Sequence, residues 1–362
     1  MSAPKERLYF IDIARSIAIL FMLEGHFIDD TLMTICRDTN NIYYSTWLYL
    51  RGFTSPTFLT ITGVVFTYLL LTNKEESFTK NIRVKKGFKR GLELIFWGYL
   101  LEYYSFHVLQ CIGFGILTIL VLFGLYKLIK IIPLWIYYFI AGVLIFSSYA
   151  FFANRQGTNH YWPENMPRFI QNMFFGKFSV FPILPKMGYT MFGAMFGVLL
   201  HTFQKSVKTW PFILLTFLIG FFLYAYIKDS LVALDNYFKT SNYHFYSFDW
   251  LYQFLGFVFM FLATLITIEK YFTIKPSLFL KIGQNTLTIY ILHSIVLYGT
   301  LIGFGIHTFL DRKINAFYII PSTILFLLSF VILVKYIDFL KFKLRFILVP
   351  IKNKTNSLFG IK

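Results

Sequence analysis

The stretch FIDIARSIAILFMLEGHFID, residues 10–29, is an apolar run of membrane-spanning length with four ionisable side chains inside it, Asp12, Arg15, Glu24 and His26. A helix in lipid tolerates such groups where they face a protein interior or a wet cavity, and there they usually serve chemistry or transport. The stretch therefore predicts a membrane-spanning helix with one functional side.

The spacing of these side chains places three of them on one stripe of that helix. At 100° per residue, Arg15 and His26 differ by about 20°, and Asp12 lies roughly 40° from His26. Glu24 falls on the opposite side and requires a separate explanation. Because Arg15 and His26 are about 16 Å apart along the axis, they cannot act on the same atoms. They could hold the two ends of one long substrate, such as a phosphopantetheine arm.

Composition predicts an all-α, polytopic integral membrane protein with one domain over residues 1–362. Of 362 residues, 57% are hydrophobic and only 14% charged, so a soluble protein would lack a polar surface. Repeated long apolar runs indicate transmembrane helices, and the alternating strands of a barrel are absent. The first run carries charges and lacks a small-residue cleavage site, so we expect no cleavable signal peptide.

About ten transmembrane helices are expected, in the cytoplasmic membrane. Their predicted limits are 9–28, 55–72, 88–106, 109–129, 131–152, 184–203, 209–227, 249–270, 284–307 and 316–340. Lys and Arg concentrate before the first span, in the even-numbered connections and in the tail. By the positive-inside rule, both termini are then cytoplasmic, and the net charge of +17 requires no nucleic acid as partner.

The longest outer connections are expected at 29–54, 153–183 and 228–248, and they are rich in aromatic residues. Aromatic side chains at a membrane border usually anchor the protein at the interface, and a sugar-binding surface also uses them. The basic stretch 80–90 opens the third span, where it sets topology or contacts anionic lipid. Lys89 and Arg90 at its end could also meet phosphate groups.

His26 is the natural proton acceptor on the stripe, because its unperturbed pKa lies near neutrality. Arg15 is permanently charged and either binds an anion or pairs with Asp12. Glu102 is a possible cavity residue near the outer end of the third span. His293, in the ninth predicted span, belongs to the site or makes an interhelical hydrogen bond.

Several catalytic templates are absent from the sequence. We find no phosphate-binding glycine loop, no clear zinc-ligand spacing and no Gly-x-Ser-x-Gly elbow. No metal is therefore expected.

Six short motifs occur along residues 8–295. Asp12-x-x-Arg15 is followed by His26 with an Arg-x10-His spacing. Further motifs are SPTFLTITG at 55–63, KRGL at 89–92, VLQCIG at 108–113, FPILP followed by Gly188 at 181–188, and GQNTL through His293 at 283–293. Their order resembles the transmembrane acyltransferase superfamily, which includes the acyltransferase 3 proteins and the heparan-α-glucosaminide N-acetyltransferase-like proteins.

In that superfamily the corresponding motifs include "FLFLSG" in span two, "VLQRIG" and "FPLFPWLG" in the heparan-type branch, and a late "GRNSLxxYxxH". The resemblance implies transfer of an acyl group, most simply acetyl, from cytoplasmic acyl-CoA to a hydroxyl or amine of an extracytoplasmic glycan or glycolipid. His26 is then catalytic with Asp12, and Arg15, Arg90 and Lys89 bind the donor or support the site.

Gln110 and Asn285, which lie in two of these motifs, are further candidate cavity residues beside Glu102 and His293. The expected partners are acyl-CoA, the acceptor and membrane lipid, and the sequence leaves the oligomeric state open. A proton-coupled transporter of a small anionic or sugar-like solute is the alternative, because buried charges are equally typical of carriers. Carriers often show internal repeats, and no convincing repeat is found here. A non-catalytic membrane protein would not need Arg15 and His26 to be aligned.

Overall fold

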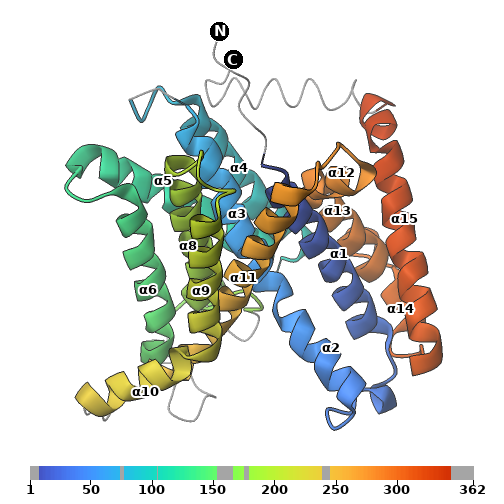
Figure 1. The fold of residues 1–362 in the computed structure, drawn as a ribbon. Helices are drawn as coiled ribbons and strands as arrows, with labels where there is room; N and C mark the ends of the chain where they lie inside the picture. Colours follow the sequence, from blue (N-terminus) through green and yellow to red (C-terminus); the bar gives the residue numbers. More distant parts are fainter. Residues whose placement is uncertain are drawn as a thin grey trace. The chain divides into compact units, whose positions relative to one another are not determined.

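The computed structural model describes residues 8–73, 77–103, 105–152, 166–174, 179–238 and 245–343, and these are helical apart from connections and two isolated bridges (Figure 1). The chain forms two compact units. Of the described residues, unit 1 holds those within 1–58 and 264–354, and unit 2 holds those within 59–263. The fold class is therefore confirmed as all-α.

The helices divide between the units as follows. Unit 1 holds α1 (Tyr9–Thr31), η1 (Thr34–Cys36), α2 (Ile42–Gly52), α12 (Leu278–Gln284), α13 (Thr286–His293), the π-turn η3 (Ser294–Tyr298), α14 (Ile306–Leu310) and α15 (Ala316–Lys343). Unit 2 holds α4 (Ile82–Leu101), α5 (Val108–Ile129), α6 (Leu134–Phe152), α7 (Arg168–Phe174), α8 (Ile183–Thr202), α9 (Trp210–Ala225), α10 (Ile227–Phe238) and η2 (Phe245–Phe248). Helices α3 (Thr54–Leu71) and α11 (Asp249–Tyr271) pass from one unit into the other.

Five helical stretches of the described chain are long and apolar enough to cross a membrane, which supports a multi-pass membrane protein. They are Ile42–Leu71, Val108–Ile129, Ile183–Thr202, Phe245–Tyr271 and Ala316–Phe339. Helices α9 and α10 would add a sixth if this pair, bent by 60°, forms one broken span. Helices α1 and α4 have 23 and 20 residues and carry many charges. Ten spans and their orientation stay a prediction.

The structure adds helices to two predicted connections and corrects one predicted span. Residues 29–54 and 228–248 were expected to be connections, but they contain the helices α2 and α10. The Asn41 side chain accepts the Tyr43 N–H at 2.9 Å and caps α2, so the aromatic residues that follow it continue a helix. The predicted span 284–307 is not one helix, because Gly299 takes a left-handed φ of 70° and ends it.

Helix α1 is anchored at its start and along one side. The Phe10 N–H donates to the Glu269 carboxylate, which supplies an acceptor at the helix N-terminus. Ser16 Oγ lies 2.6 Å from the Phe279 carbonyl oxygen and accepts the Gly283 N–H at 2.9 Å. These bonds hold α12 against α1 so closely that glycine is required, since a Cβ at Gly283 would lie 2.5 Å from a backbone oxygen of α1.

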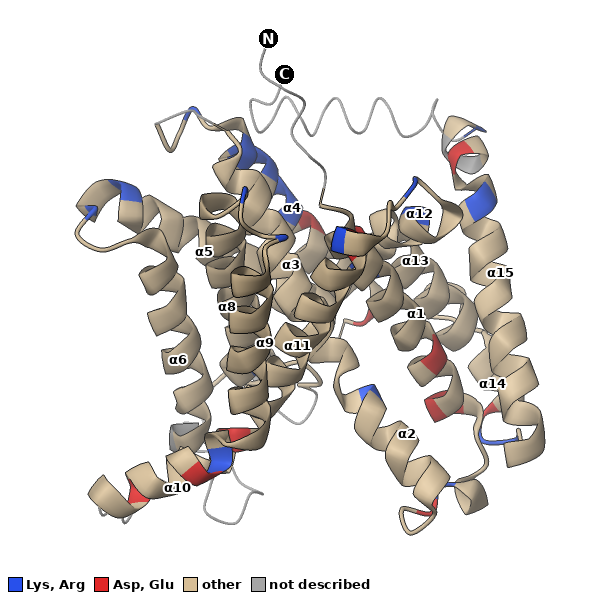
Figure 2. Ribbon diagram, viewed as in Figure 1, with Lys and Arg blue, Asp and Glu red and all other residues tan. Residues whose placement is uncertain are grey.

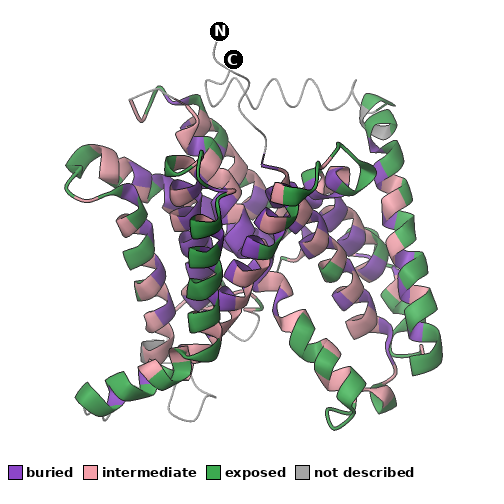
Figure 3. Ribbon diagram, viewed as in Figure 1, coloured by how far each residue is buried: buried purple, intermediate pink, exposed green. Residues whose placement is uncertain are grey.

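Buried apolar side chains complete the packing of α1 (Figure 3). The unit 1 core consists of Ile19, Leu23, Phe27, Leu32, Ile282, Ile289, Leu297, Ile319, Phe326, Phe330 and Val334. Phe27 and Phe326 stack with ring centres 4.7 Å apart, which joins α1 to α15. The core therefore fixes α1, α13 and α15 as one rigid set that positions the ionisable stripe.

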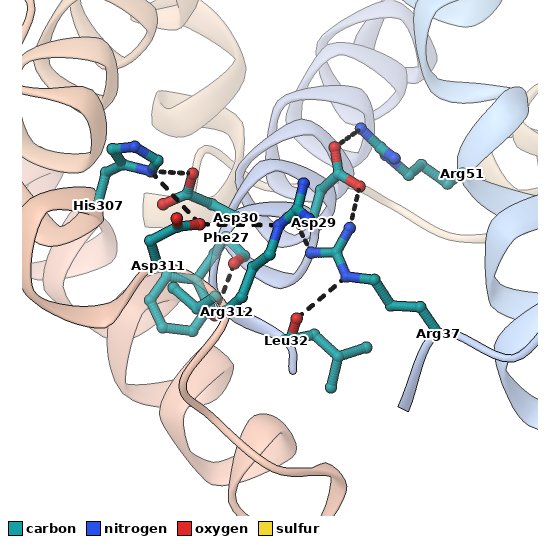
Figure 4. A network of polar contacts seen from close by, with 10 residues as sticks. Phe27, Asp29, Asp30, Leu32, Arg37, Arg51, His307, Asp311 and Arg312 are labelled. Atoms are coloured by element: carbon teal, nitrogen blue, oxygen red, sulfur yellow. Dashed lines mark hydrogen bonds and ion pairs between the residues drawn. The ribbon is translucent and has the colours of Figure 1, made fainter. Parts of the chain in front are cut away.

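Ion pairs and hydrogen bonds tie down the C-terminal end of α1 (Figure 4). Asp29 pairs with Arg51 of α2 at 2.9 Å and with Arg37 at 3.5 Å. The neighbouring Asp30 accepts a hydrogen bond from His307 of α14 across 2.7 Å. Because α1 is held from both sides three and four residues beyond His26, that histidine has a fixed position and rotation within unit 1.

Figure 2 shows Lys and Arg gathered on the first turns of α4, at the mouth of the third predicted span. By the positive-inside rule we predict that this end is cytoplasmic. A reporter fused after Lys362 should therefore read as cytoplasmic, and one inserted at Asn40 as extracytoplasmic. A measured extracytoplasmic signal after Lys362 would contradict the predicted topology. It would place His26 near the cytoplasmic face instead of the extracytoplasmic face.

Candidate active site

His26 of α1 contacts a second histidine, His293, although 267 residues separate the two in the sequence. His26 Nδ1 lies 3.0 Å from Nε2 of His293, the last residue of α13. His293 is fully buried, whereas His26 is half-buried. In such a pair one nitrogen donates the proton and the other accepts it, so the two rings hold each other in one orientation.

The chain leaves the α-helical path immediately after His293. Residues Ser294–Tyr298 form a π-turn, a local distortion that occurs frequently at functional sites. Tyr298 thereby comes within 6.1 Å of the His26 ring, and Tyr290 within 4.9 Å of the His293 ring, measured between ring centres. The histidine pair is consequently surrounded by two tyrosines.

Arg15 contacts the same helix at its other end. Its Nη2 donates to Oγ1 of Thr286, the first residue of α13, at 3.2 Å. Arg15 and His26 thus both face α13, as their positions on the predicted stripe require. Asp12 is 9% exposed and lies beside the α1–α12 contact. Asn285 joins α12 to α13, and its amide donates to the Lys281 carbonyl oxygen at 2.8 Å.

The other predicted site residues belong to unit 2. Arg90 pairs with Glu93 at 3.0 Å on the α4 surface, and both side chains are 41% exposed. Lys89 precedes this pair and is half-buried. Glu102 ends α4 and bonds to His107. Their roles in binding or in a cavity stay predictions.

Gln110 is fully buried at the start of α5. Its Oε1 accepts the His107 N–H at 3.0 Å, and its Nε2 donates to the Ser105 carbonyl oxygen at 3.2 Å. These bonds give the side chain a capping role at this helix end. A role for Gln110 in the active site stays a prediction, and its two hydrogen bonds leave the side chain little freedom to reorient.

The structure also explains Glu24, which lies on the opposite side of α1 from His26. Trp47 of α2 donates its indole N–H to Glu24 Oε1 at 2.6 Å, and the Arg51 guanidinium lies 5.5 Å from the centre of the Trp47 ring. The sequence did not identify Trp47 as the partner of Glu24, or Thr286 as the partner of Arg15. Trp47 lies among aromatic residues that suggested interface anchors, and Thr286 is an ordinary residue of a motif.

The long apolar helices of the described chain indicate a multi-pass membrane protein, and in unit 1 helices α1 and α13 bring two histidines into contact. A family model described as heparan-alpha-glucosaminide N-acetyltransferase, catalytic, matches residues 7–220, more than half of the chain. The chain therefore belongs to this family and is an acyl-CoA-dependent acetyltransferase, with acetyl-CoA as the family's donor. No curated protein matches the chain. The matched residues include His26 and Arg15, while Asn285 and His293 follow them.

Proposed function

We propose that this protein moves an acetyl group from cytoplasmic acetyl-CoA to a hydroxyl or amine of an extracytoplasmic glycan or glycolipid, with His26 as the central catalytic residue. The hydrogen bond of 3.0 Å between His26 Nδ1 and His293 Nε2 carries this proposal, because it orients a titratable base inside an acetyltransferase-family chain. The location is the cytoplasmic membrane, and no metal takes part.

In the first route His26 acts as a general base. The Nδ1–H donates to His293, so Nε2 takes the proton of the acceptor hydroxyl or amine while the acceptor attacks the thioester carbonyl carbon. The C–S bond then breaks, and the CoA thiolate leaves and recovers the proton. His293 stabilises the imidazolium that forms on His26, because it accepts the remaining N–H.

In the second route His26 carries the acetyl group. Its Nε2 attacks the thioester carbonyl carbon, the C–S bond breaks, and the CoA thiolate takes the proton that the acylated imidazole loses. The acetylimidazole then passes the acetyl group to the acceptor, whose proton returns to His26. This route would join a cytoplasmic donor to an extracytoplasmic acceptor without both being bound together. Burst release of CoA in the absence of acceptor, at one equivalent per protein, would distinguish it from the general-base route.

The test of the proposed function uses purified protein in lipid nanodiscs with acetyl-CoA labelled on the acetyl group. We expect cleavage of the thioester and transfer of label to added amino sugars or glycans. A panel of longer acyl-CoA donors determines the acyl length. Solute uptake into proteoliposomes with no thioester cleavage would overturn the proposal in favour of a proton-coupled carrier.

Arg15 is proposed to bind an anionic part of the donor, about 16 Å from His26 along α1. Arg15→Lys keeps the charge but loses the planar fork that reaches Thr286 and a phosphate together. Donor binding should weaken about tenfold, since a hydrogen bond to a charged group typically contributes 1.5–3 kcal/mol. Equilibrium binding of acetyl-CoA measures this, and affinity equal to that of the wild type would reject the assignment.

A further inference from the structure

Two carboxylates and an imidazole meet where the end of α1 contacts α14, and all three belong to unit 1 (Figure 4). His307 Nδ1 lies 2.7 Å from Oδ1 of Asp30 and 3.9 Å from Oδ1 of Asp311. One ligand atom from each of these side chains lies within 4.8 Å of the other two. We call this group the α1–α14 triad. Because Asp30 and His307 are 277 residues apart, no spacing in the sequence indicates it.

One oxygen of the α1–α14 triad is buried without a partner. The Asp30 side chain is only 8% exposed, and its Oδ1 accepts the His307 N–H. Its Oδ2 is buried and accepts no hydrogen bond from any described residue. A buried carboxylate oxygen that faces neither a donor nor a cation is costly. This oxygen therefore indicates a cation at the triad, and it does so independently of how closely the three side chains are spaced.

The arginines of this region leave the negative charge of the triad only partly balanced. Arg37 and Arg51 pair with Asp29, at 3.5 and 2.9 Å, so these two guanidinium groups serve another carboxylate. Arg312 is paired with the triad, but its Nε lies 3.9 Å from Asp311 Oδ1 and its side chain is 58% exposed. Such a long, exposed ion pair contributes little. A divalent cation would supply the charge that the two carboxylates of the triad lack.

Main-chain hydrogen bonds hold the two segments of the triad in register. The Arg312 N–H donates to the Asp30 carbonyl oxygen at 3.1 Å, and the Ile314 N–H donates to that of Thr31 at 2.9 Å. The Met33 N–H donates in return to the Ile314 carbonyl oxygen at 2.9 Å. The backbone is thus fixed on both sides of the three side chains before any ion arrives, and such preorganisation is what a metal site requires.

We propose that Asp30, His307 and Asp311 bind a divalent transition-metal ion of the zinc class and thereby join the end of α1 to α14. One imidazole with two carboxylates is a donor set that zinc accepts, and water completes the coordination. The ion takes the place of the proton between His307 and Asp30, and this proton is released to the solvent on binding. The free Oδ2 lets Asp30 coordinate without losing its other contacts.

The ion would be structural and take no part in acetyl transfer. Asp30 follows His26 by four residues, about one helical turn, and α14 follows the π-turn that contains Tyr298. A bound ion therefore stabilises the two segments that carry one histidine and one tyrosine of the candidate active site.

Direct binding of zinc tests the site. The protein is purified without a histidine tag, stripped with EDTA and placed in phosphatidylcholine nanodiscs, and ZnCl2 is titrated by calorimetry against empty nanodiscs. We expect one equivalent of zinc per chain, much weaker binding of CaCl2, and an unfolding temperature that rises with the zinc concentration. Absence of saturable zinc binding, or a preference for calcium, would overturn the proposal.

Two variants at exposed positions locate the ion. His307→Ala and Asp311→Asn should each weaken zinc binding at least about tenfold, because loss of an outer-shell partner alone typically costs 10–100-fold in affinity. Both side chains are 49% exposed, so the variants should fold, which the unfolding temperature without zinc verifies. Asp38→Asn is the matched control, since it removes an exposed carboxylate of the same unit outside the triad, and its affinity should equal that of the wild type.

His26→Ala distinguishes the α1–α14 triad from the other histidine cluster of unit 1. Zinc binding should persist in this variant, because His26 contributes no ligand to the triad. Zinc binding that is lost in His26→Ala and retained in His307→Ala would assign the ion to the histidine pair and overturn the proposal.

Discussion

Replacing His26 by alanine is expected to lower the rate of acetyl transfer about 10²–10⁴-fold, the range that general-base catalysis typically contributes. His26 is the titratable base on the Asp12–Arg15 stripe, and His293 orients its ring through the bond of 3.0 Å. Release of CoA and transfer of labelled acetyl, measured on purified protein, provide the rates.

The His26→Ala variant should still insert into the membrane, because unit 1 packs mainly through apolar contacts between α1, α13 and α15. Its affinity for acetyl-CoA should stay near that of the wild type. His201→Ala is the matched control: this histidine lies in the last turn of α8 in unit 2 and contacts the Tyr68 ring instead of the site. Full activity of His26→Ala would contradict the histidine mechanism.

His293→Ala separates orientation from catalysis. The variant keeps the His26 base and removes the group that fixes its tautomer, so we expect a smaller loss than for His26→Ala. A pH–rate profile should shift as well, because His293 no longer accepts the His26 N–H. If His293→Ala abolishes transfer while His26→Ala does not, the site centres on α13 and His26 is the supporting residue.

The helical period explains why the α1 stripe could be predicted. Residues that differ by multiples of about 3.6 share a face, so Arg15 and His26 had to face a common partner wherever α1 packed. The observed helix, Tyr9–Thr31, contains the predicted span 9–28. The length of the run and the position of its charges were sufficient for this, because both are local properties of the chain.

The helix that packs beside His26 could not be predicted from the neighbouring sequence, because it lies far along the chain. His26 and His293 are 267 residues apart, and the sequence of α13 allowed either a site residue or an interhelical bond. Glu24 and Trp47 form their contact because α2 continues as a helix through a stretch that aromatic composition assigned to a connection.

Close backbone contact in unit 2 leads to the largest expected effect on stability. A Cβ at Gly193 of α8 would lie 2.0 Å from the Thr60 carbonyl oxygen of α3, a separation that real atoms do not adopt. Gly193→Ala must therefore push two helix backbones apart, and small residues at such interfaces are what permits their close approach. We expect a destabilisation of about 3 kcal/mol or more, seen as a lower unfolding temperature and reduced yield of monodisperse protein.

Gly124→Ala makes the same chemical change in the same unit with the opposite expectation. Its Cβ would lie 3.3 Å from the Phe78 ring, a side chain that can move, and alanine favours the α5 helix over glycine by roughly 0.5–1 kcal/mol. The unfolding temperature should therefore change little or rise. Equal unfolding temperatures for the two variants would show that α3 and α8 are not in backbone contact, and the packing that positions α8 would have to be reassigned.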